Sequence, residues 1–381
     1  MNLKPLVVAL LIVVAGVGPA AAATATTEST QSGDAYAGTH VEFEAEGSAV
    51  SDYAVNDDVV LEEIVVQSAS EVESDGELGA GAGLGGDASV AGAEVAVTTR
   101  AETSATVESE SGAEMEAHDN ERGVLVVTSG DGEQYVHANV SGDGEAEADS
   151  DDRVVVETEG DTEGTFIVVG EGNVTVDGEG NVSATVGEDG QLVYRQYDGE
   201  RSDEEEQQER MIANGTAVAE VYYQQASDDS EDDSERAADV VEYGQDTTVE
   251  VTERSANRVN MTVERTESEG KVVIATISES AMESADELEV YVDGEAAAEA
   301  SSYGDVRSAA DGDEPRYLVR QSSSAEAATE VVIGIDHFSQ REVSMQSGAD
   351  GGDSVTGAGP GFGVIAAVAA LGATLLVRRR L

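Results

Sequence analysis

The chain has 381 residues, among them 80 Asp and Glu against 19 Lys and Arg, so its formal net charge is −61 at neutral pH. Nucleic-acid binders that neutralise phosphate need a basic surface, and this charge excludes that class of protein. No cysteine is present, so disulfides, thiolate metal sites and a cysteine nucleophile are excluded, and the fold depends on the burial of apolar side chains.

The first 23 residues have the layout of a secretory signal peptide. A single cation, Lys4, precedes a continuous apolar run from Leu6 to Val17, and small residues follow as far as Ala23. This order predicts cleavage near Ala23 and export by the general secretory route. The alternative, an uncleaved anchor, is less favoured because the run is short for a membrane span, which takes about 20 residues.

Residues 24–38 are rich in Thr, Ser and Ala, and we predict a flexible leader there. Residues 39–226 form a predicted β-rich unit, in which short Val-rich runs alternate with Gly, Asp and Asn. Val is stiff at χ1 and favours the half-buried, pleated surface of a sheet. The spacing of the runs, about 8 to 12 residues, is typical of a sandwich or a solenoid. The predicted strands are 124–128, 153–157, 165–169, 174–176, 182–186 and 192–197.

One short repeat bears on the choice between these two architectures. Residues 171–175 read Glu-Gly-Asn-Val-Thr and residues 179–183 read Glu-Gly-Asn-Val-Ser, with Asp177 and Gly178 between them. An Asp-Gly pair flanked by alternating apolar residues is typical of a hairpin, because Gly accepts the positive φ of a tight turn. Two copies do not establish a solenoid, so we predict a sandwich and keep the β-solenoid as the alternative for the first unit.

A short helix is predicted near residues 203–213. Ser202 and Glu205 have the spacing of a capping box, in which each side chain bonds the other residue's backbone N–H. Gly215 is placed to end the helix, and residues 216–225 return to a strand pattern.

Residues 227–239 contain a run of like charges and predict a disordered acidic linker, at which we place a domain boundary. Residues 240–347 form a second β-rich unit, which suits an immunoglobulin-like sandwich. Its predicted strands are 247–253, 258–264, 271–277, 288–292, 316–321, 330–335 and 342–346. Helical insertions are expected near 281–287 and 296–309, and residues 348–358 are a Gly, Asp and Ser spacer. The fold class is therefore mainly β, with two sandwich-like extracellular units.

The last segment, residues 359–381, begins Gly-Pro-Gly-Phe-Gly, continues with an apolar stretch from Val364 to Val377, and ends with three arginines and a leucine. The arginines place this end in the cytoplasm by the positive-inside rule, which leaves the rest of the chain outside. The apolar stretch is several residues shorter than the span that a hydrocarbon core of about 30 Å requires. It therefore makes a poor permanent transmembrane helix.

This combination resembles the Pro-Gly-Phe C-terminal (PGF-CTERM) sorting tail of haloarchaeal surface proteins, which archaeosortase processes. The resemblance implies that the tail is cut near Pro360, Gly361 and Phe362 and that the new C-terminus is joined to a membrane lipid, as in a GPI signal. If the tail is retained, the segment still tethers the chain to the membrane. The scarcity of Lys and the acid spread along the chain are also similar to proteins of haloarchaea, since multimolar salt screens such self-repulsion.

Five asparagines stand in the Asn-x-Ser/Thr sequence of N-glycosylation sites. On an exported chain they are candidate acceptors, and the alternative for each is an ordinary junction between turn and strand. They are Asn139, Asn173, Asn181, Asn214 and Asn260.

Other motifs do not predict a catalytic, cofactor or metal site. Residues 81–86 fit Gly-x-Gly-x-x-Gly, but no apolar strand precedes them, so we expect a loop. The four histidines lack zinc-protease spacing, and no calcium-loop pattern is present. Asp336 and His337 lie close to Ser339, but no nucleophile elbow accompanies them.

Together these features predict a secreted, glycosylated and membrane- or lipid-anchored cell-surface protein of a haloarchaeon, with a structural or interaction role in or near the S-layer, and not an enzyme. The expected partners are the membrane, archaeosortase and the secretion machinery, and a surface-layer glycoprotein or glycan. The alternative is an adhesin that binds carbohydrate or protein, for which Tyr222 and Tyr223 would offer exposed stacking surfaces. An extracellular hydrolase is less favoured, because 80 acidic residues supply paired carboxylates by chance.

Overall fold

The computed structural model describes residues 34–69, 92–101, 103–130, 132–142, 144–158, 162–225, 236–244, 246–282, 288–321 and 328–347. Several predicted features lie outside these residues: the signal peptide, the glycine-rich run, most of the acidic linker, the spacer and the sorting tail. No helix in the described ranges is long and apolar enough to cross a membrane. The fold is mainly β, as predicted, and two helices belong to the described part of the chain.

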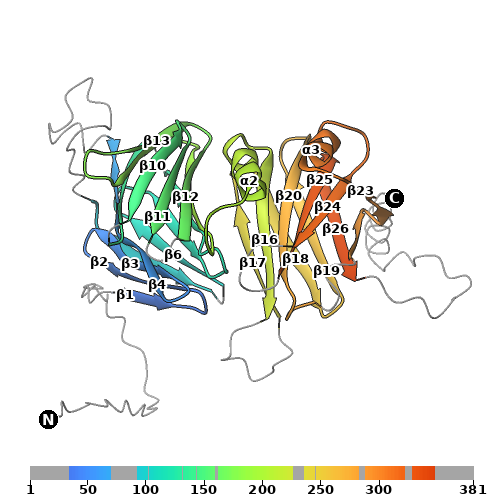
Figure 1. Ribbon diagram of the computed structural model, residues 1–381, viewed down its shortest axis with the longest axis horizontal. Coiled ribbons are helices and arrows are strands. Elements are labelled where there is room, and N and C mark those ends of the chain that lie inside the picture. The colour runs from blue at the N-terminus through green and yellow to red at the C-terminus, as the bar shows by residue number, and fades with distance from the viewer. Residues whose placement is uncertain are drawn as a thin grey trace, which may run out of the picture. The chain divides into compact units, whose positions relative to one another are not determined.

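The N-terminal sandwich consists of sheets A and B, in which every paired strand runs antiparallel to its neighbour (Figure 1). Sheet A has the order β1 (Asp34–Ala37), β2 (Val41–Glu46), β3 (Ala49–Val55), β4 (Asp58–Ser68), β9 (Gln134–Val140), β14 (Val182–Val186), β13 (Gly172–Val176). Sheet B has the order β10 (Glu145–Ser150), β11 (Arg153–Thr158), β12 (Thr162–Val169), β15 (Gln191–Gln196), β8 (Leu125–Thr128), β7 (Glu114–His118), β6 (Ser104–Ser109), β5 (Val95–Arg100). This pairing excludes the solenoid alternative.

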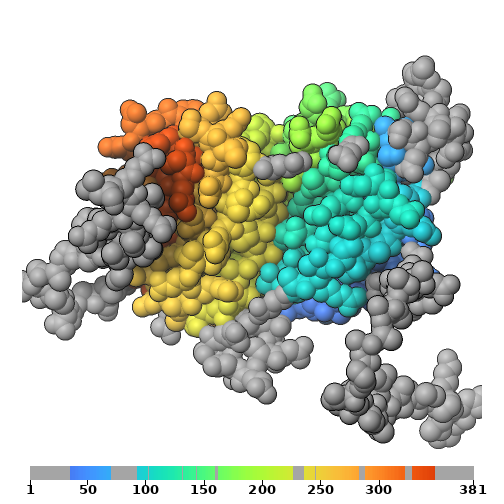
Figure 2. Space-filling view, turned by 180° about the vertical axis from the view of Figure 1, so that it is seen from behind, coloured from blue at the N-terminus to red at the C-terminus, as the bar shows by residue number. Residues whose placement is uncertain are grey.

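The C-terminal sandwich consists of sheets C and D. Sheet C has the order β17 (Arg236–Glu242), β16 (Ala217–Gln225), β20 (Glu269–Ser278), β25 (Ala328–His337), β24 (Arg316–Gln321), β23 (Ala298–Glu299). Sheet D has the order β18 (Thr247–Ser255), β19 (Arg258–Arg265), β26 (Gln340–Ser347), β21 (Leu288–Val292), β22 (Glu295–Ala296). The helices are α2 (Asp203–Ala213) and α3 (Tyr303–Ala310). Figure 2 shows the N-terminal sandwich in blue to green and the C-terminal sandwich in yellow to red.

Along the strands, buried apolar side chains alternate with exposed acidic ones, which explains how so acidic a chain forms these sheets. In β2 the side chains of Val41, Phe43 and Ala45 are buried while the three intervening glutamates are exposed. Each sandwich buries such inward residues in one core between its sheets. Val is the commonest residue in both cores, because its branched side chain suits the pleated surface.

A third apolar core joins the two sandwiches. It contains outward-facing residues of sheet B, such as Val126 and Ile167, together with Met211 and Ile212 of α2. It also contains residues of β16, β17, β20 and α3. Sheet B therefore buries both faces where it meets this core, and the described residues from Gly33 onward group into one compact unit.

The strands predicted from Val-rich runs are all present, but three expectations differ from the structure. The predicted leader, residues 24–38, includes β1, which pairs with β2. The predicted helical insertion at 296–309 contains β23 and only then α3. The predicted boundary at 227–239 does not coincide with a change of sheet, because β16 pairs with β17 across the acidic run and with β20. The change from the N-terminal sandwich to the C-terminal one occurs instead between β15 and β16, where α2 lies.

The hairpin predicted at Asp177 and Gly178 is confirmed between β13 and β14. The Asp177 carboxylate accepts hydrogen bonds from the backbone N–H groups of Glu179 and Asn181, at 2.8 and 2.9 Å. The positive φ falls at Gly180, at 91°, and not at Gly178. Asp177 therefore shapes a longer turn than the Asp-Gly pair alone predicts.

Candidate functional site

The loop after β7 connects the N-terminal strands to the junction between the sandwiches. Asp119 in this loop is buried, and its carboxylate accepts hydrogen bonds from the backbone N–H groups of Thr39, His40 and Val41 at 2.7, 2.6 and 2.9 Å. Its own backbone oxygen accepts a hydrogen bond from the side-chain amide of Gln224 on β16, at 3.0 Å. One residue thus contacts sheet A and sheet C.

A buried histidine and a buried carboxylate meet beside this loop. His118 Nδ1 lies 3.0 Å from Asp239 Oδ1 on β17, and Asn120 donates to the other oxygen of Asp239 at 2.7 Å. Burial alone would lower the pKa of His118, but the charge of Asp239 and its hydrogen bond outweigh burial, with smaller contributions from Glu116 and Glu242, and raise this pKa. The junction therefore favours a charged His118.

A second buried pair joins sheet B to sheet C. Arg195 on β15 and Glu220 on β16 are 1% and 2% exposed, and their side chains lie 2.9 Å apart. Tyr222 donates a hydrogen bond to the second oxygen of Glu220 at 2.7 Å, and Arg195 donates to Gln208 of α2 at 3.3 Å. The remaining nitrogens of Arg195, Nε and Nη1, have no hydrogen-bond partner in the described part of the chain.

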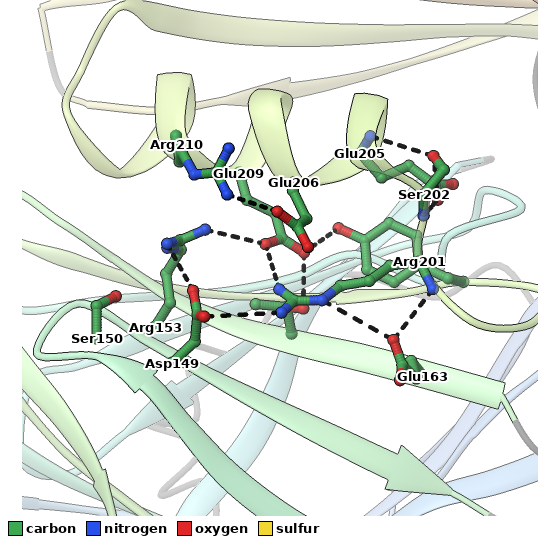
Figure 3. Close-up of polar contacts among 12 residues, drawn as sticks. Asp149, Ser150, Arg153, Glu163, Arg201, Ser202, Glu205, Glu206, Glu209 and Arg210 are labelled. Carbon is green, nitrogen blue, oxygen red and sulfur yellow. Dashed lines mark hydrogen bonds and ion pairs between the residues drawn. The ribbon is translucent and has the colours of Figure 1, made fainter.

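Glu209 of α2 is the centre of the largest ionic cluster (Figure 3). Its fully buried carboxylate accepts hydrogen bonds from Arg201 at 2.7 Å and Arg153 at 3.3 Å. The hydroxyl groups of Thr165 and Tyr197 also donate to it, at 2.7 and 2.8 Å. Four donors from the loop before α2 and from sheet B therefore converge on one carboxylate, which holds the helix against the sheet.

Glu205 has two roles at the N-terminus of α2. Its carboxylate accepts a hydrogen bond from the backbone N–H of Ser202 at 2.7 Å, and the Ser202 hydroxyl accepts from the backbone of Glu205, so the predicted capping box is confirmed. The same carboxylate accepts from Arg122 of the N-terminal sandwich at 2.9 Å. Burial would raise the pKa of Glu205, but Arg122 and Ser202 hold it below its ordinary value.

Two recesses flank α2. The smaller, of about 200 Å³, is lined by Arg122, Gln208, Tyr303 and Glu330, among others. Tyr303 donates to Glu330 at 3.0 Å and accepts from Gln208 at 3.2 Å, and burial raises the pKa of Glu330. The larger, of about 450 Å³, is lined by polar side chains of α2 and by Tyr303 and Arg307 of α3.

We call the ion pairs of this junction the ionic clamp; they are Arg122–Glu205, Arg153–Glu209, Arg201–Glu209 and Arg195–Glu220. Its arginines and carboxylates contact one another, and the carboxylates of Glu205 and Glu209 accept several hydrogen bonds each, which fixes the geometry of their ion pairs. Within the described ranges, no group of three or more His, Asp or Glu is arranged to hold a metal ion.

The predicted glycosylation candidates lie on several elements. Asn139 is on β9, Asn173 on β13, Asn181 just before β14, Asn214 at the C-cap of α2 and Asn260 on β19. They are exposed or half-buried. Whether they carry glycans stays a prediction.

The expected stacking surface of Tyr222 and Tyr223 is wrong. The two side chains are 2% and 1% exposed, and neighbouring residues of a strand face opposite ways. Tyr222 lies in the core that joins the sandwiches and Tyr223 in the core of the C-terminal sandwich.

Asp336 and His337 form a contact of 2.5 Å, and Arg341 binds the other oxygen of Asp336.

Sequence reasoning missed the clamp, although two local signals mark it. Glu220 interrupts the apolar run Ala217–Tyr223, and Arg195 stands in the apolar strand β15. A charge at the centre of an apolar strand predicts a buried pair, because an unpaired buried charge is costly.

The comparisons with known proteins concern the C-terminal tail. The PGF-CTERM motif matches residues 359–380, which include Pro360, Gly361 and Phe362. A search of curated proteins finds no match for the chain. The chain therefore carries the PGF-CTERM sorting tail of archaeosortase substrates and is a secreted, archaeosortase-processed protein anchored at the cell surface.

Proposed function

We propose that this protein is a structural or interaction component of a haloarchaeal cell surface, associated with the S-layer, and that it is not an enzyme. The observation that carries the proposal is the sorting tail on a chain whose two sandwiches are joined by a buried core and ionic clamp. A clamped pair of sandwiches resists relative motion, and a fixed geometry suits a load-bearing or spacing part more than a hinge. The haloarchaeal assignment is supported by the net charge of −61.

Cross-linking of intact cells in their growth brine tests the S-layer association. The expected result is a cross-linked species that contains this chain and the surface-layer glycoprotein, recovered from the envelope fraction. A matched sample in which the surface layer is first released, for example by removing divalent cations, should lose that species. If the cross-links join this chain only to membrane lipids or to unrelated proteins, the proposed S-layer association is wrong while surface anchoring stands.

A second candidate is a binding module for a polar ligand. The recess of about 450 Å³ beside α2 favours it, because aromatic and paired polar side chains such as Tyr303, Arg210 and Arg307 are typical of sites for sugars or peptides. A glycan array in high salt tests this candidate. Binding that Arg307→Ala abolishes would support it, and an array without signal would contradict it.

A further inference from the structure

On one outer surface of the N-terminal sandwich, three adjacent strands contribute no outward acidic, Lys or Arg side chain of their own. We call it the neutral face, and it comprises the outward residues of three adjacent strands of sheet A, β9, β14 and β13. Their neighbours along each strand, such as Val136, Val182 and Val174, are buried in the core, so alternation turns these residues outward. The neutral face consists of Tyr135, His137, Asn139, Asn173, Thr175, Ser183 and Thr185; Asn173 is exposed, Ser183 is buried among its neighbours at 7% exposure, and the other five are half-buried.

The neutral face differs sharply from other outer surfaces of the sandwich. All three outward residues of β2 are glutamates, and the edge strand β10 reads Glu-Ala-Glu-Ala-Asp-Ser. In a chain with 80 acidic residues, an acid-free stretch across three strands needs a reason. Two carboxylates from outside these strands contact the neutral face: Asp177 lies 3.0 Å from His137, and Glu63 on β4 accepts a hydrogen bond from Asn139 at 3.2 Å. The acidic coat that keeps the rest of the chain hydrated in brine is thus absent from this surface.

Three of the five glycosylation candidates border the neutral face. Asn139 belongs to it, Asn173 belongs to it, and Asn181 directly precedes β14, two residues before Ser183. In the ladder Asn173 is opposite Thr185, which is in turn opposite Tyr135. A glycan on Asn173, on the edge strand β13, or on Asn181, at the turn before β14, would therefore have the uncharged side chains within reach.

Local hydrogen bonds distinguish the glycosylation candidates at the neutral face, and Asn260 of the other sandwich serves as a comparison. The amide nitrogen of Asn139 donates to Glu63 at 3.2 Å, as that of Asn260 does to Glu253 at 2.8 Å. The acceptor nitrogen must be free to react, so these contacts oppose glycosylation. Asn173 is exposed, and its side chain accepts a hydrogen bond from the hydroxyl of Thr185 through the carbonyl oxygen. For Asn181 the contacts found within the described residues involve its backbone.

We propose that N-linked glycans on Asn173 and Asn181 lie across the neutral face and cover it. This inference rests on the proposed place of the chain at the cell surface and on the glycosylation predicted from its sequence, and it names the sites and the surface that the sugar occupies. Sugar hydroxyls can exchange hydrogen bonds with Ser, Thr and His side chains, and the C–H face of a sugar packs on an aromatic ring such as Tyr135. Covering ionised carboxylates would cost their hydration, and the Asp177 carboxylate that contacts the neutral face is already largely buried against His137.

Glycopeptide mass spectrometry of the protein from its own host tests the choice of sites. Asn173 and Asn181 are expected to be occupied, and Asn139 and Asn260 to be mainly unmodified. Occupancy of Asn139 or Asn260 in preference to Asn173 and Asn181 would overturn the proposal. A chain with no glycan would overturn it too, whereas the surface anchoring on which the proposed function rests, read by detergent-phase partitioning of the same sample, is independent of both results.

Hydroxyl-radical labelling tests whether the sugar covers the face. In the glycosylated protein Tyr135 is expected to be protected, and the double variant Asn173→Gln with Asn181→Gln should lose that protection. The matched control Asn260→Gln lies in the other sandwich and should leave the labelling of Tyr135 unchanged. Equal labelling of Tyr135 in the wild type and the double variant would show that the glycans point away from the neutral face, and the proposal would be wrong.

Discussion

Four arginines, Arg122, Arg153, Arg195 and Arg265, are buried, where salt screens an ion pair much less than at the surface. Arg122, Arg153 and Arg195 are buried and bind carboxylates, although only 19 cationic residues are available to balance 80 acidic ones. The guanidinium group is planar and weakly hydrated, so it suits buried pairs better than an ammonium group does. Exposed ion pairs lose strength as salt rises, and buried pairs lose much less. Arg122, Arg153 and Arg195 therefore stabilise the junction at any salt concentration.

Glu209→Gln tests the largest ionic cluster. Because Glu209 is fully buried and accepts from two arginines and two hydroxyl groups, we expect the free energy of unfolding to fall by about 3 to 5 kcal/mol. The matched control is Glu206→Gln on the same helix, whose half-exposed pair with Arg210 should contribute at most about 1 kcal/mol. Urea unfolding in concentrated KCl measures both. Equal effects of the two variants would contradict the assignment of Glu209 as the centre of the cluster.

The pair of His118 and Asp239 makes stability depend on pH above neutrality. The pKa of His118 is raised above its ordinary value of 6.5, so its contribution is fully present below 6.5 and is lost as pH rises through the folded-state pKa. Asp239, Glu116 and Glu242 are the charged groups that face it. We expect the urea midpoint to fall as pH rises above 6.5 and through the folded-state pKa, and His118→Gln to flatten that fall. A variant that keeps the same pH dependence would contradict this role.

At the scale of elements, the sequence predicts a strand or helix correctly where its residues differ clearly from those of the neighbouring segments. Val-rich strands such as β14 stand out from their surroundings, and the capping box of α2 is a local pattern that tertiary context does not alter. The strand β10, Glu145–Ser150, has no buried residue and leaves no apolar signal. The acidic run suggested a domain boundary because like charges predict a linker, but the flanking strands β16 and β17 pair with each other. Such non-local pairing has no signature in either strand alone.

The clamp was harder to predict for a similar reason. With 80 acidic residues, the few that are buried cannot be recognised by residue type, and only their apolar neighbours distinguish them. Glu220 has such neighbours, whereas Glu205 and Glu209 stand in a helix of low hydrophobicity among other acids. The partners of these glutamates come from distant parts of the chain, as Arg122 shows for Glu205.

Ser202→Ala tests the capping box of α2. The variant removes the hydroxyl that accepts from the backbone of Glu205 and loosens the carboxylate that also binds Arg122. We expect a loss of about 1 kcal/mol or somewhat more in the free energy of unfolding, the usual effect of removing an N-cap. The control is Ser302→Ala at the N-cap of α3, where Ser302 is exposed and accepts from the backbone of Asp305, and its effect should be smaller. A larger effect at Ser302 would contradict the linkage between cap and clamp.

At the scale of the whole molecule, net charge and the joined cores predict how the protein unfolds. A chain with a net charge of −61 repels itself, and salt screens that repulsion, so we expect the melting temperature to rise steeply between about 0.2 M and about 3 M KCl. Because a third core and the clamp join the sandwiches, we expect one cooperative transition in high salt. Calorimetry measures both quantities. Two separate transitions at high salt would show that the sandwiches are independent domains.

The most direct test of the central claim is the intact mass of the mature protein from the membrane fraction of its host. Export, cleavage near Ala23 and archaeosortase processing predict a species that lacks residues 1–23 and the segment after Phe362 and that carries a lipid at its new C-terminus. A dominant species that retains Met1, or that ends with Arg378, Arg379, Arg380 and Leu381, would contradict this account of how the protein reaches and holds the cell surface.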